Sequence, residues 1–82
     1  MIKIYGSDNC VWCAKAKDLC ENFYLDYEYL NIGPNEEFPD GRVFTGGKIP
    51  QIFWDNRYVG GYVDLEREIE NTNIGNYGQG KL

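Results

Sequence analysis

Two cysteines separated by two residues stand between a strand-like and a helix-like segment near the start of the chain. The motif reads Cys10-Val11-Trp12-Cys13 and follows the alternating segment Ile2-Lys3-Ile4-Tyr5. In the first turn of a helix, two such sulfurs lie on one face, close enough to form a disulfide. Unpaired amides and the dipole at a helix N-terminus also favour a thiolate over a thiol. The sequence therefore predicts a redox centre in which Cys10, at the helix tip, is the reactive and exposed sulfur.

The predicted redox helix runs from Cys10 to about Phe23, because this segment contains neither proline nor glycine. Its apolar residues recur at helical spacing and form the expected core face: Ala16, Leu19, Cys20 and Phe23. Cys13 leans toward this face. Cys20 lies one core repeat further on, about 10.5 Å of helical rise from Cys13, so these two thiols cannot bridge within the helix. Cys20 is accordingly predicted to be a buried core thiol.

Strand signals follow the predicted helix. A second strand is expected over 26–32. The next segment, 33–41, holds two prolines and two glycines, which limits it to a loop or one helical turn. Two short apolar runs, 51–54 and 57–60, flank Asp55-Asn56, residues that tolerate the positive φ of a tight turn. The two runs are therefore predicted to form a β-hairpin.

A final helix is expected after this hairpin. Asp64 can cap it, and Leu65 and Ile69 would then face inward. Residues 71–82 contain three glycines and no periodicity, which is typical of a mobile tail. The resulting order of elements is strand, helix, strand, irregular connection, hairpin and helix. A thioredoxin-like α/β domain requires this order.

Length, charge and cysteine count narrow the class of protein. With 82 residues and 43% apolar content, the chain can build one small core. A net charge of −5 disfavours nucleic acid and anionic membranes as partners. No leader-like segment precedes the first strand and no run approaches about 20 apolar residues, so a cytoplasmic protein is expected. Three cysteines and no histidine fit a reducing compartment and fall short of the four ligands of a structural zinc site, so no metal is expected.

Three motifs, in this order, resemble those of glutaredoxins. They are Cys10-Val11-Trp12-Cys13 followed by Ala14-Lys15-Ala16-Lys17-Asp18-Leu19, then Ile49-Pro50-Gln51-Ile52-Phe53, then Val59-Gly60-Gly61-Tyr62-Val63-Asp64-Leu65. The resemblance implies a glutaredoxin-type, thioredoxin-like α/β fold: a central mixed four-stranded sheet flanked by helices, with the second helix reduced or absent. We therefore expect one domain over 1–71 and a flexible tail over 72–82.

The resemblance also implies a site for glutathione. Pro50 would be cis and the backbone of Ile49 would pair with the cysteinyl part of the tripeptide; a proline that merely begins a strand is the alternative. The γ-glutamyl subsite is matched by Gly61, Tyr62, Val63 and Asp64. Independently of the family, Gly60-Gly61 either lets a ligand approach the backbone closely or simply ends the strand. A helix N-terminus beside it suits a carboxylate.

Two further residues are assigned to this site. Trp12, between the cysteines, is expected either to stack on substrate or to pack against the loop. Lys48 stands where the family frequently has a threonine, and its ammonium is a candidate partner for the glycyl carboxylate of glutathione or for Cys10. The basic residue that many glutaredoxins carry before the first cysteine is absent, because the loop here reads Ser7-Asp8-Asn9.

The implied activity is glutathione-dependent thiol-disulfide exchange by a monomer. Cys10 attacks a protein disulfide or a mixed disulfide with glutathione, Cys13 resolves the intermediate, and glutathione reduces the resulting disulfide. Ribonucleotide reductase is one candidate protein substrate. Because the chain has no histidine, an imidazole general base is excluded.

Two alternatives stay open. Some glutaredoxins hold an iron-sulfur cluster between two subunits with glutathione as co-ligand, and Val11 in place of the usual proline removes one obstacle to this. The second alternative is a redoxin recharged by thioredoxin reductase. The Gly60-Gly61-Tyr62-Val63-Asp64 run favours glutathione over this second alternative.

Overall fold

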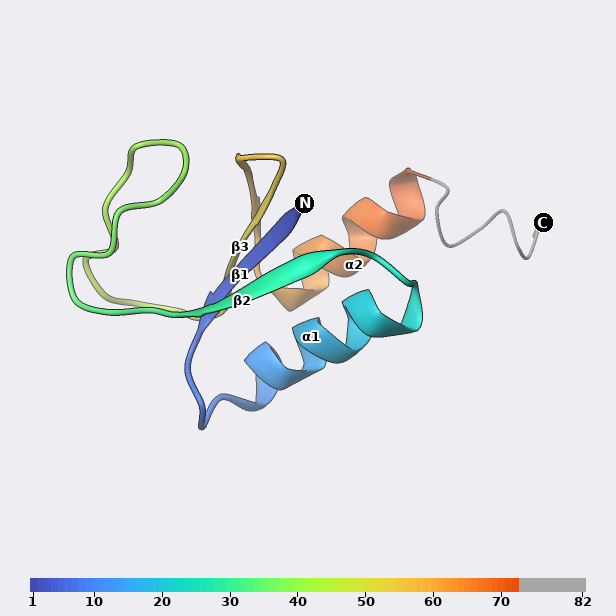
Figure 1. Ribbon diagram of the computed structural model, residues 1–82, viewed down its shortest axis with the longest axis horizontal. Coiled ribbons are helices and arrows are strands. Elements are labelled where there is room, and N and C mark those ends of the chain that lie inside the picture. The colour runs from blue at the N-terminus through green and yellow to red at the C-terminus, as the bar shows by residue number, and fades with distance from the viewer. Residues whose placement is uncertain (73–82) are drawn as a thin grey trace.

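The structure is a computed structural model that describes residues 1–72 of the chain. In chain order its elements are β1 (Ile2–Gly6), α1 (Val11–Asn22), β2 (Tyr27–Asn31), β3 (Gln51–Trp54), β4 (Arg57–Gly60) and α2 (Tyr62–Asn71). Figure 1 shows them from blue at the N-terminus to orange-red at the end of α2. The tail predicted over 72–82 lies, apart from Thr72, outside the described residues.

The four strands form one mixed sheet in the order β2-β1-β3-β4. β1 runs parallel to β2, and α1 is the crossover that such a parallel pair requires. β1 is antiparallel to β3, which is antiparallel to β4. The predicted mixed four-stranded sheet is confirmed.

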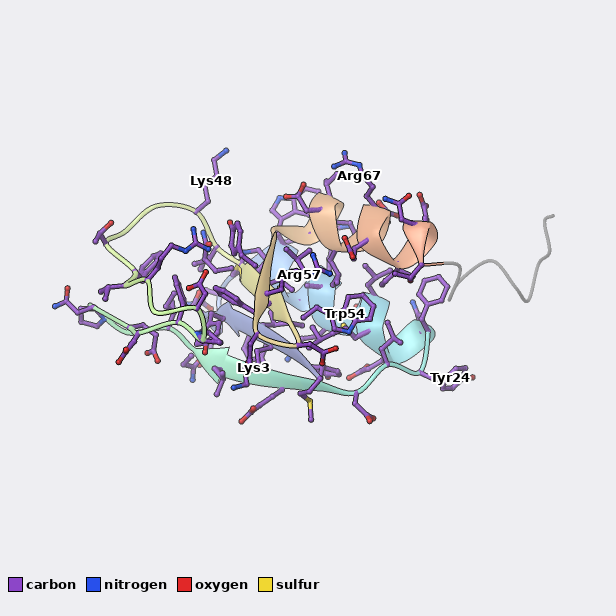
Figure 2. All side chains as sticks on the ribbon, turned by 90° about the horizontal axis from the view of Figure 1, so that it is seen from above. Lys3, Tyr24, Lys48, Trp54, Arg57 and Arg67 are labelled. Carbon is purple, nitrogen blue, oxygen red and sulfur yellow. A yellow bond between two sulfur atoms is a disulfide. The ribbon has the colours of Figure 1, made fainter. Side chains whose placement is uncertain are left out.

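Both helices cover the same face of this sheet (Figure 1). Apolar side chains from two strands and both helices form one buried cluster there: Ile2, Ile4, Ala16, Leu19, Cys20, Ile52, Leu65 and Ile69. The predicted core faces of both helices are therefore confirmed, including the buried thiol of Cys20. Charged side chains lie outside this layer, and Figure 2 shows Lys48 and Arg67 projecting from the molecule.

The opposite face of the sheet is covered by a loop in place of a helix. Residues 32–50 connect β2 to β3 without helical structure. The second helix was predicted to be reduced or absent, and in this segment it is absent. The loop is folded on itself by a bridge between Glu37 and Val43. From it, Phe38 packs with Tyr5 and Phe53 in a second buried cluster. This cluster anchors the loop that ends at Pro50.

The predicted hairpin joins β3 to β4. Asp55 and Asn56 have φ values of 52° and 68°, the left-handed conformations that a two-residue hairpin turn needs. The hairpin prediction is thus confirmed.

The start of the last helix differs from the expectation. α2 begins at Tyr62, two residues before the predicted cap at Asp64, and Gly61 is its N-cap residue. Because Gly61 has no side chain to cap the helix, the cap comes from within the first turn: the Gly61 N–H donates to Asp64 Oδ2 at 3.0 Å. Asp64 therefore does cap the helix, but from its third position.

Candidate active site around Cys10 and Cys13

Cys10 and Cys13 form a disulfide at the N-terminus of α1, with their Cα atoms 5.2 Å apart. Cys10 is the N-cap residue of this helix. The backbone N–H of Cys13 donates to Cys10 Sγ at 3.1 Å, and the N–H of Ala14 donates to the Cys10 carbonyl at 3.1 Å. The Cys13 amide and the helix dipole stabilise a thiolate at Cys10 once the disulfide is reduced.

The two sulfurs differ in access to solvent. Cys10 is partly exposed, whereas Cys13 is fully buried. Gly6, at the end of β1, packs against the buried sulfur, since a β-carbon built at Gly6 would lie 2.6 Å from Cys13 Sγ. The predicted difference in exposure is therefore confirmed, and the roles of Cys10 as the attacking and Cys13 as the resolving sulfur stay predictions.

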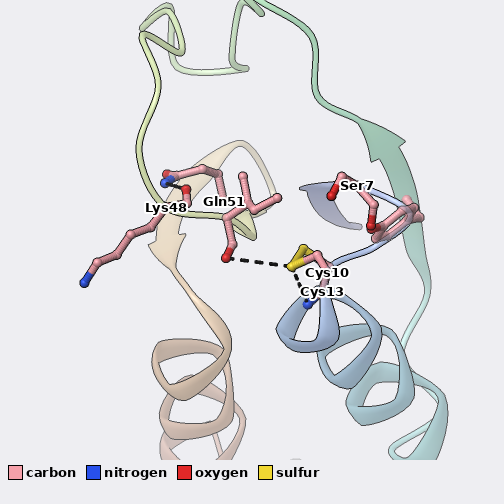
Figure 3. The surroundings of a disulfide bond; sticks show 7 residues. Ser7, Cys10, Cys13, Lys48 and Gln51 are labelled. Carbon is pink, nitrogen blue, oxygen red and sulfur yellow. Dashed lines mark hydrogen bonds between the residues drawn. A yellow bond between two sulfur atoms is a disulfide. The ribbon is translucent and has the colours of Figure 1, made fainter.

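A second chain segment faces the disulfide from the start of β3. The Ile49–Pro50 peptide bond is cis, as the resemblance implied, and Pro50 is buried. The carbonyl oxygen of Ile49 lies 4.0 Å from Cys10 Sγ (Figure 3). This segment is held in part by Gln51, whose Nε2 donates to the Lys48 carbonyl at 2.6 Å. The backbone of Ile49 is thus presented to anything bound at Cys10.

A groove of about 420 Å³ runs past these segments and reaches the N-terminus of α2. Its volume lies within the range of small-molecule sites. The structure brings all eight predicted binding residues to its lining: Trp12, Lys48, Ile49, Pro50, Gly61, Tyr62, Val63 and Asp64. The predicted residues thus lie along one groove, and their role in binding glutathione stays a prediction.

Aromatic rings form one wall of this groove. The rings of Trp12 and Tyr62 have centroids 5.6 Å apart, so the first turns of the two helices meet through them. The ammonium of Lys15 lies 5.3 Å from the Trp12 ring centroid. Trp12 is nevertheless 52% exposed. It therefore packs on a neighbouring ring and still offers a free surface to a ligand.

The N-terminus of α2 forms the anion-accepting part of the groove. Amides in the first turn of a helix have no intrahelical partner, and here they belong to Tyr62, Val63 and Asp64. The Asp64 carboxylate, which is exposed, also forms an ion pair with Arg67 at 3.4 Å. A carboxylate and an amino group bound side by side would find complementary partners here.

Lys48 lies at the rim. Its side chain is exposed and extends away from Cys10 in Figure 3. In this conformation it does not contact the sulfur, and it remains available to a carboxylate at this end of the groove.

Two lining residues were missed from the sequence. Gln51 directly follows Pro50, and this adjacency was the available signal. Tyr58 reaches the groove from β4, where it pairs with Phe53 of β3. The centroid of its ring lies 4.4 Å from the Arg42 guanidinium. The position of Tyr58 depends on the hairpin register, which residue types alone do not reveal.

Other site types find little support in the described part of the chain. Within residues 1–72, no three His, Cys, Asp or Glu side chains gather as a metal site. Neither of the two described helices is long and apolar enough to cross a membrane.

Known proteins share both the sequence and the fold. The glutaredoxin family model matches residues 2–59. Glutaredoxin 1 of Escherichia coli K12 is 33% identical over 78 residues, covering 84% of this chain and 92% of the relative. Glutaredoxin 1 of Rickettsia prowazekii is 40% identical over 68 residues, covering 78% and 72%.

Solved structures agree with these relatives. Glutaredoxin 1 from Francisella tularensis superposes with a TM-score of 0.67 at 23% identity, covering 87% of this chain and 93% of that one. Reduced Escherichia coli glutaredoxin superposes with a TM-score of 0.62 at 26% identity, covering 85% and 93%. The chain belongs to the glutaredoxin family of thiol-disulfide oxidoreductases, and Cys10 and Cys13 are its redox-active pair.

Proposed function

We propose that this glutaredoxin uses glutathione to reduce protein disulfides and mixed disulfides between proteins and glutathione. The observation that carries the proposal is the groove that joins the Ile49–Pro50 backbone to the N-terminus of α2, with Cys10 Sγ 4.0 Å from the Ile49 carbonyl oxygen. These three parts match the three chemical features of glutathione: a sulfur, a peptide backbone and an amino-acid carboxylate.

The proposed binding mode follows the chemistry of each part. The backbone of Ile49 pairs with the cysteinyl residue of glutathione, so that its sulfur points at Cys10. The N–H groups of Val63 and Asp64 donate to the γ-glutamyl carboxylate, and the Asp64 carboxylate accepts from the neighbouring ammonium. Lys48 pairs with the glycyl carboxylate, and Trp12 covers the tripeptide from the side.

The reaction proceeds by two exchanges. The Cys10 thiolate attacks one sulfur of the substrate disulfide, forms a mixed disulfide and releases the other sulfur as a thiolate that takes a proton from water. Cys13 then loses its proton and attacks Cys10, which releases the second thiol and forms the Cys10–Cys13 disulfide. Two glutathione molecules reduce this bond and leave as oxidised glutathione. When the substrate is a glutathione mixed disulfide, a second glutathione can replace Cys13.

Single serine substitutions test this division of labour. Cys10→Ser removes the attacking sulfur, so it should abolish both the reduction of a glutathionylated peptide and that of a peptide with an internal disulfide. Cys13→Ser should retain the first activity and lose the second. Loss of both activities in Cys13→Ser would contradict the proposed roles.

Lys48 is tested by its effect on substrate affinity. An exposed ion pair is worth up to about 1 kcal/mol, so Lys48→Ala should raise the KM for a glutathionylated peptide about two- to fivefold. Lys3→Ala is the matched control, because Lys3 lies on β1 outside the groove lining. An unchanged KM in Lys48→Ala removes this residue from the site.

The electron donor is tested by direct comparison. The reduced protein should be regenerated by glutathione with glutathione reductase, faster than by NADPH with thioredoxin reductase. Oxidised ribonucleotide reductase is the proposed protein substrate to add to this assay.

The proposed working form is a cytoplasmic monomer without a metal. Visible absorbance after anaerobic purification with glutathione would instead indicate an iron-sulfur protein.

A further inference from the structure

The hydroxyl of Tyr29 reaches the loop that carries the redox centre. Tyr29 lies on β2, paired with Ile4 of β1, and its side chain packs toward the helices. Its hydroxyl donates to the carbonyl of Ser7 at 2.8 Å. The ammonium of Lys17, on α1, lies 4.5 Å from the centroid of the same ring. Tyr29 therefore ties together β2, α1 and the loop before Cys10.

The same hydroxyl lies close to the buried sulfur. A β-carbon built at Gly6 would lie 2.6 Å from Cys13 Sγ and 2.7 Å from the Tyr29 hydroxyl oxygen. The sulfur and the hydroxyl oxygen thus both contact Gly6, and they cannot be further apart than these two distances together. Gly6 is also held by its carbonyl, which accepts from the Ile32 N–H at 2.9 Å.

The hydrogen bond from Tyr29 holds the loop close to the redox pair, because only Asp8 and Asn9 separate Ser7 from Cys10. In Figure 3 Ser7 and Lys48 lie on opposite sides of the disulfide. Burial, followed by the charge of Asp8, raises the pKa of Tyr29, so its hydroxyl remains a donor at neutral pH. The hydrogen bond to Ser7 therefore persists over the pH range in which Cys10 reacts.

We propose that Tyr29 is a positioning residue for the resolving step: its hydrogen bond to Ser7 presses the Gly6–Ser7 backbone against Cys13 and keeps this sulfur directed at Cys10. The proposal rests on the dithiol chemistry of the Cys10–Cys13 pair and needs no particular glutathione-binding mode. Without the hydroxyl, the wall beside Cys13 loosens and the sulfur reaches other rotamers and solvent.

The step that Tyr29 serves is the second exchange. Cys13 gives its proton to water, and its thiolate attacks Cys10 Sγ in the mixed disulfide. The new Cys10–Cys13 bond forms as the bond to the substrate sulfur breaks, so Cys13 is oxidised and the leaving sulfur is reduced and takes up a proton. Attack needs the three sulfurs nearly in line, and a sulfur free to turn away attacks less often.

Tyr29→Phe removes only the hydroxyl and is the test variant. Reduction of a peptide with an internal disulfide, which requires Cys13, should slow about five- to tenfold. Deglutathionylation of a peptide, which requires only Cys10, should slow much less. Tyr27→Phe is the matched control, since Tyr27 lies on the same strand face but its hydroxyl donates to Glu21. It should leave both rates unchanged.

Alkylation gives a second readout that involves no glutathione. In a Cys10→Ser background, iodoacetamide should modify Cys13 severalfold faster when Tyr29 is also replaced by Phe, and the Tyr27→Phe protein should not differ from its parent. Cys20, buried elsewhere in the core, reports general loosening in the same mass spectrum. Equal Cys13 alkylation in both tyrosine variants, or a parallel rise at Cys20, would overturn the proposal.

Discussion

At the scale of single residues, Gly6 is a glycine that the packing requires. Its φ is not in the left-handed region, so the requirement comes from close neighbours and not from the backbone conformation. An added β-carbon would meet Cys13 and the Tyr29 hydroxyl. Overpacking of this kind usually costs about 1–3 kcal/mol, so Gly6→Ala should lower the free energy of unfolding by that amount. Urea unfolding measures the change. Gly33→Ala is the control, because its β-carbon would find its nearest neighbour, Glu36 Oε1, at 3.9 Å. Equal stability of the two variants would show that the loop yields without cost.

Cys20 gives a prediction about pH. Burial, with a contribution from Glu21, raises the pKa of the Cys20 thiol to about 11. Between about pH 9 and 11 the unfolded chain has released this proton while the folded protein keeps it, so stability falls as pH rises, by at most about 1.4 kcal/mol per pH unit. The free energy of unfolding of the oxidised protein, measured in urea, should therefore fall more steeply from pH 8 to 10 in the wild type than in Cys20→Ala. Parallel pH profiles would contradict the burial effect.

Some residues were predictable from sequence because their signals are local. Cys10 and Cys13 owe their roles to one helical turn, and this turn is visible in the spacing of the motif. Tyr29 and Tyr58 are different, since each is placed by its pairing with a neighbouring strand. Strand register places them, and a register is set by packing between segments distant in sequence. Neither residue type nor periodicity contains that information.

At the scale of elements, the loop over 32–50 packs on the sheet through the buried ring of Phe38, with Ile32 and Phe44 beside it. The Phe38 ring lies 5.0 Å from the rings of both Tyr5 and Phe53. Phe38→Ala should lower the free energy of unfolding by about 3 kcal/mol, because it empties this cluster. It should also raise hydrogen exchange throughout the loop. Val43→Ala, at a side chain that is 47% exposed, should change stability by less than about 0.5 kcal/mol.

The same loop shows where prediction from sequence stops. The two prolines and two glycines of its segment 33–41 correctly excluded a long helix, but they do not reveal that Phe38 turns back onto the sheet. The start of α2 illustrates a smaller limit. Asp64 signals a cap, yet the signal fits either the position before a helix or its third residue, and only the extended backbone at Gly61 decides between them.

At the scale of the whole molecule, the fold directs two helix N-termini at one groove. Cys10 and Gly61 are the N-cap residues of α1 and α2, and residues from both first turns line the site. The chain carries a net charge of −5, which alone would repel an anionic tripeptide. In the proposed binding mode, the amides at the N-terminus of α2 and the ammonium of Lys48 offset that repulsion. The parallel β1–α1–β2 unit thus carries the redox pair, and the final helix carries the proposed ligand site.

The functional unit is predicted to end with α2. The described part of the chain, residues 1–72, holds two buried clusters, a four-stranded sheet and the groove lining given above, and the Thr72 N–H at the end of α2 donates to Glu68 O at 3.0 Å. A chain ending after Thr72 should therefore keep its melting temperature within about 2 °C, since no buried apolar contact of the described fold is removed. Its rate of peptide deglutathionylation should equal that of the full chain.

Ending the chain instead after Leu65 is the control, because this removes Ile69 from the core and should prevent folding. A fall of more than about 5 °C in the chain ending at Thr72 would mean that the last ten residues add about 1 kcal/mol, and the domain boundary would then lie further along the chain.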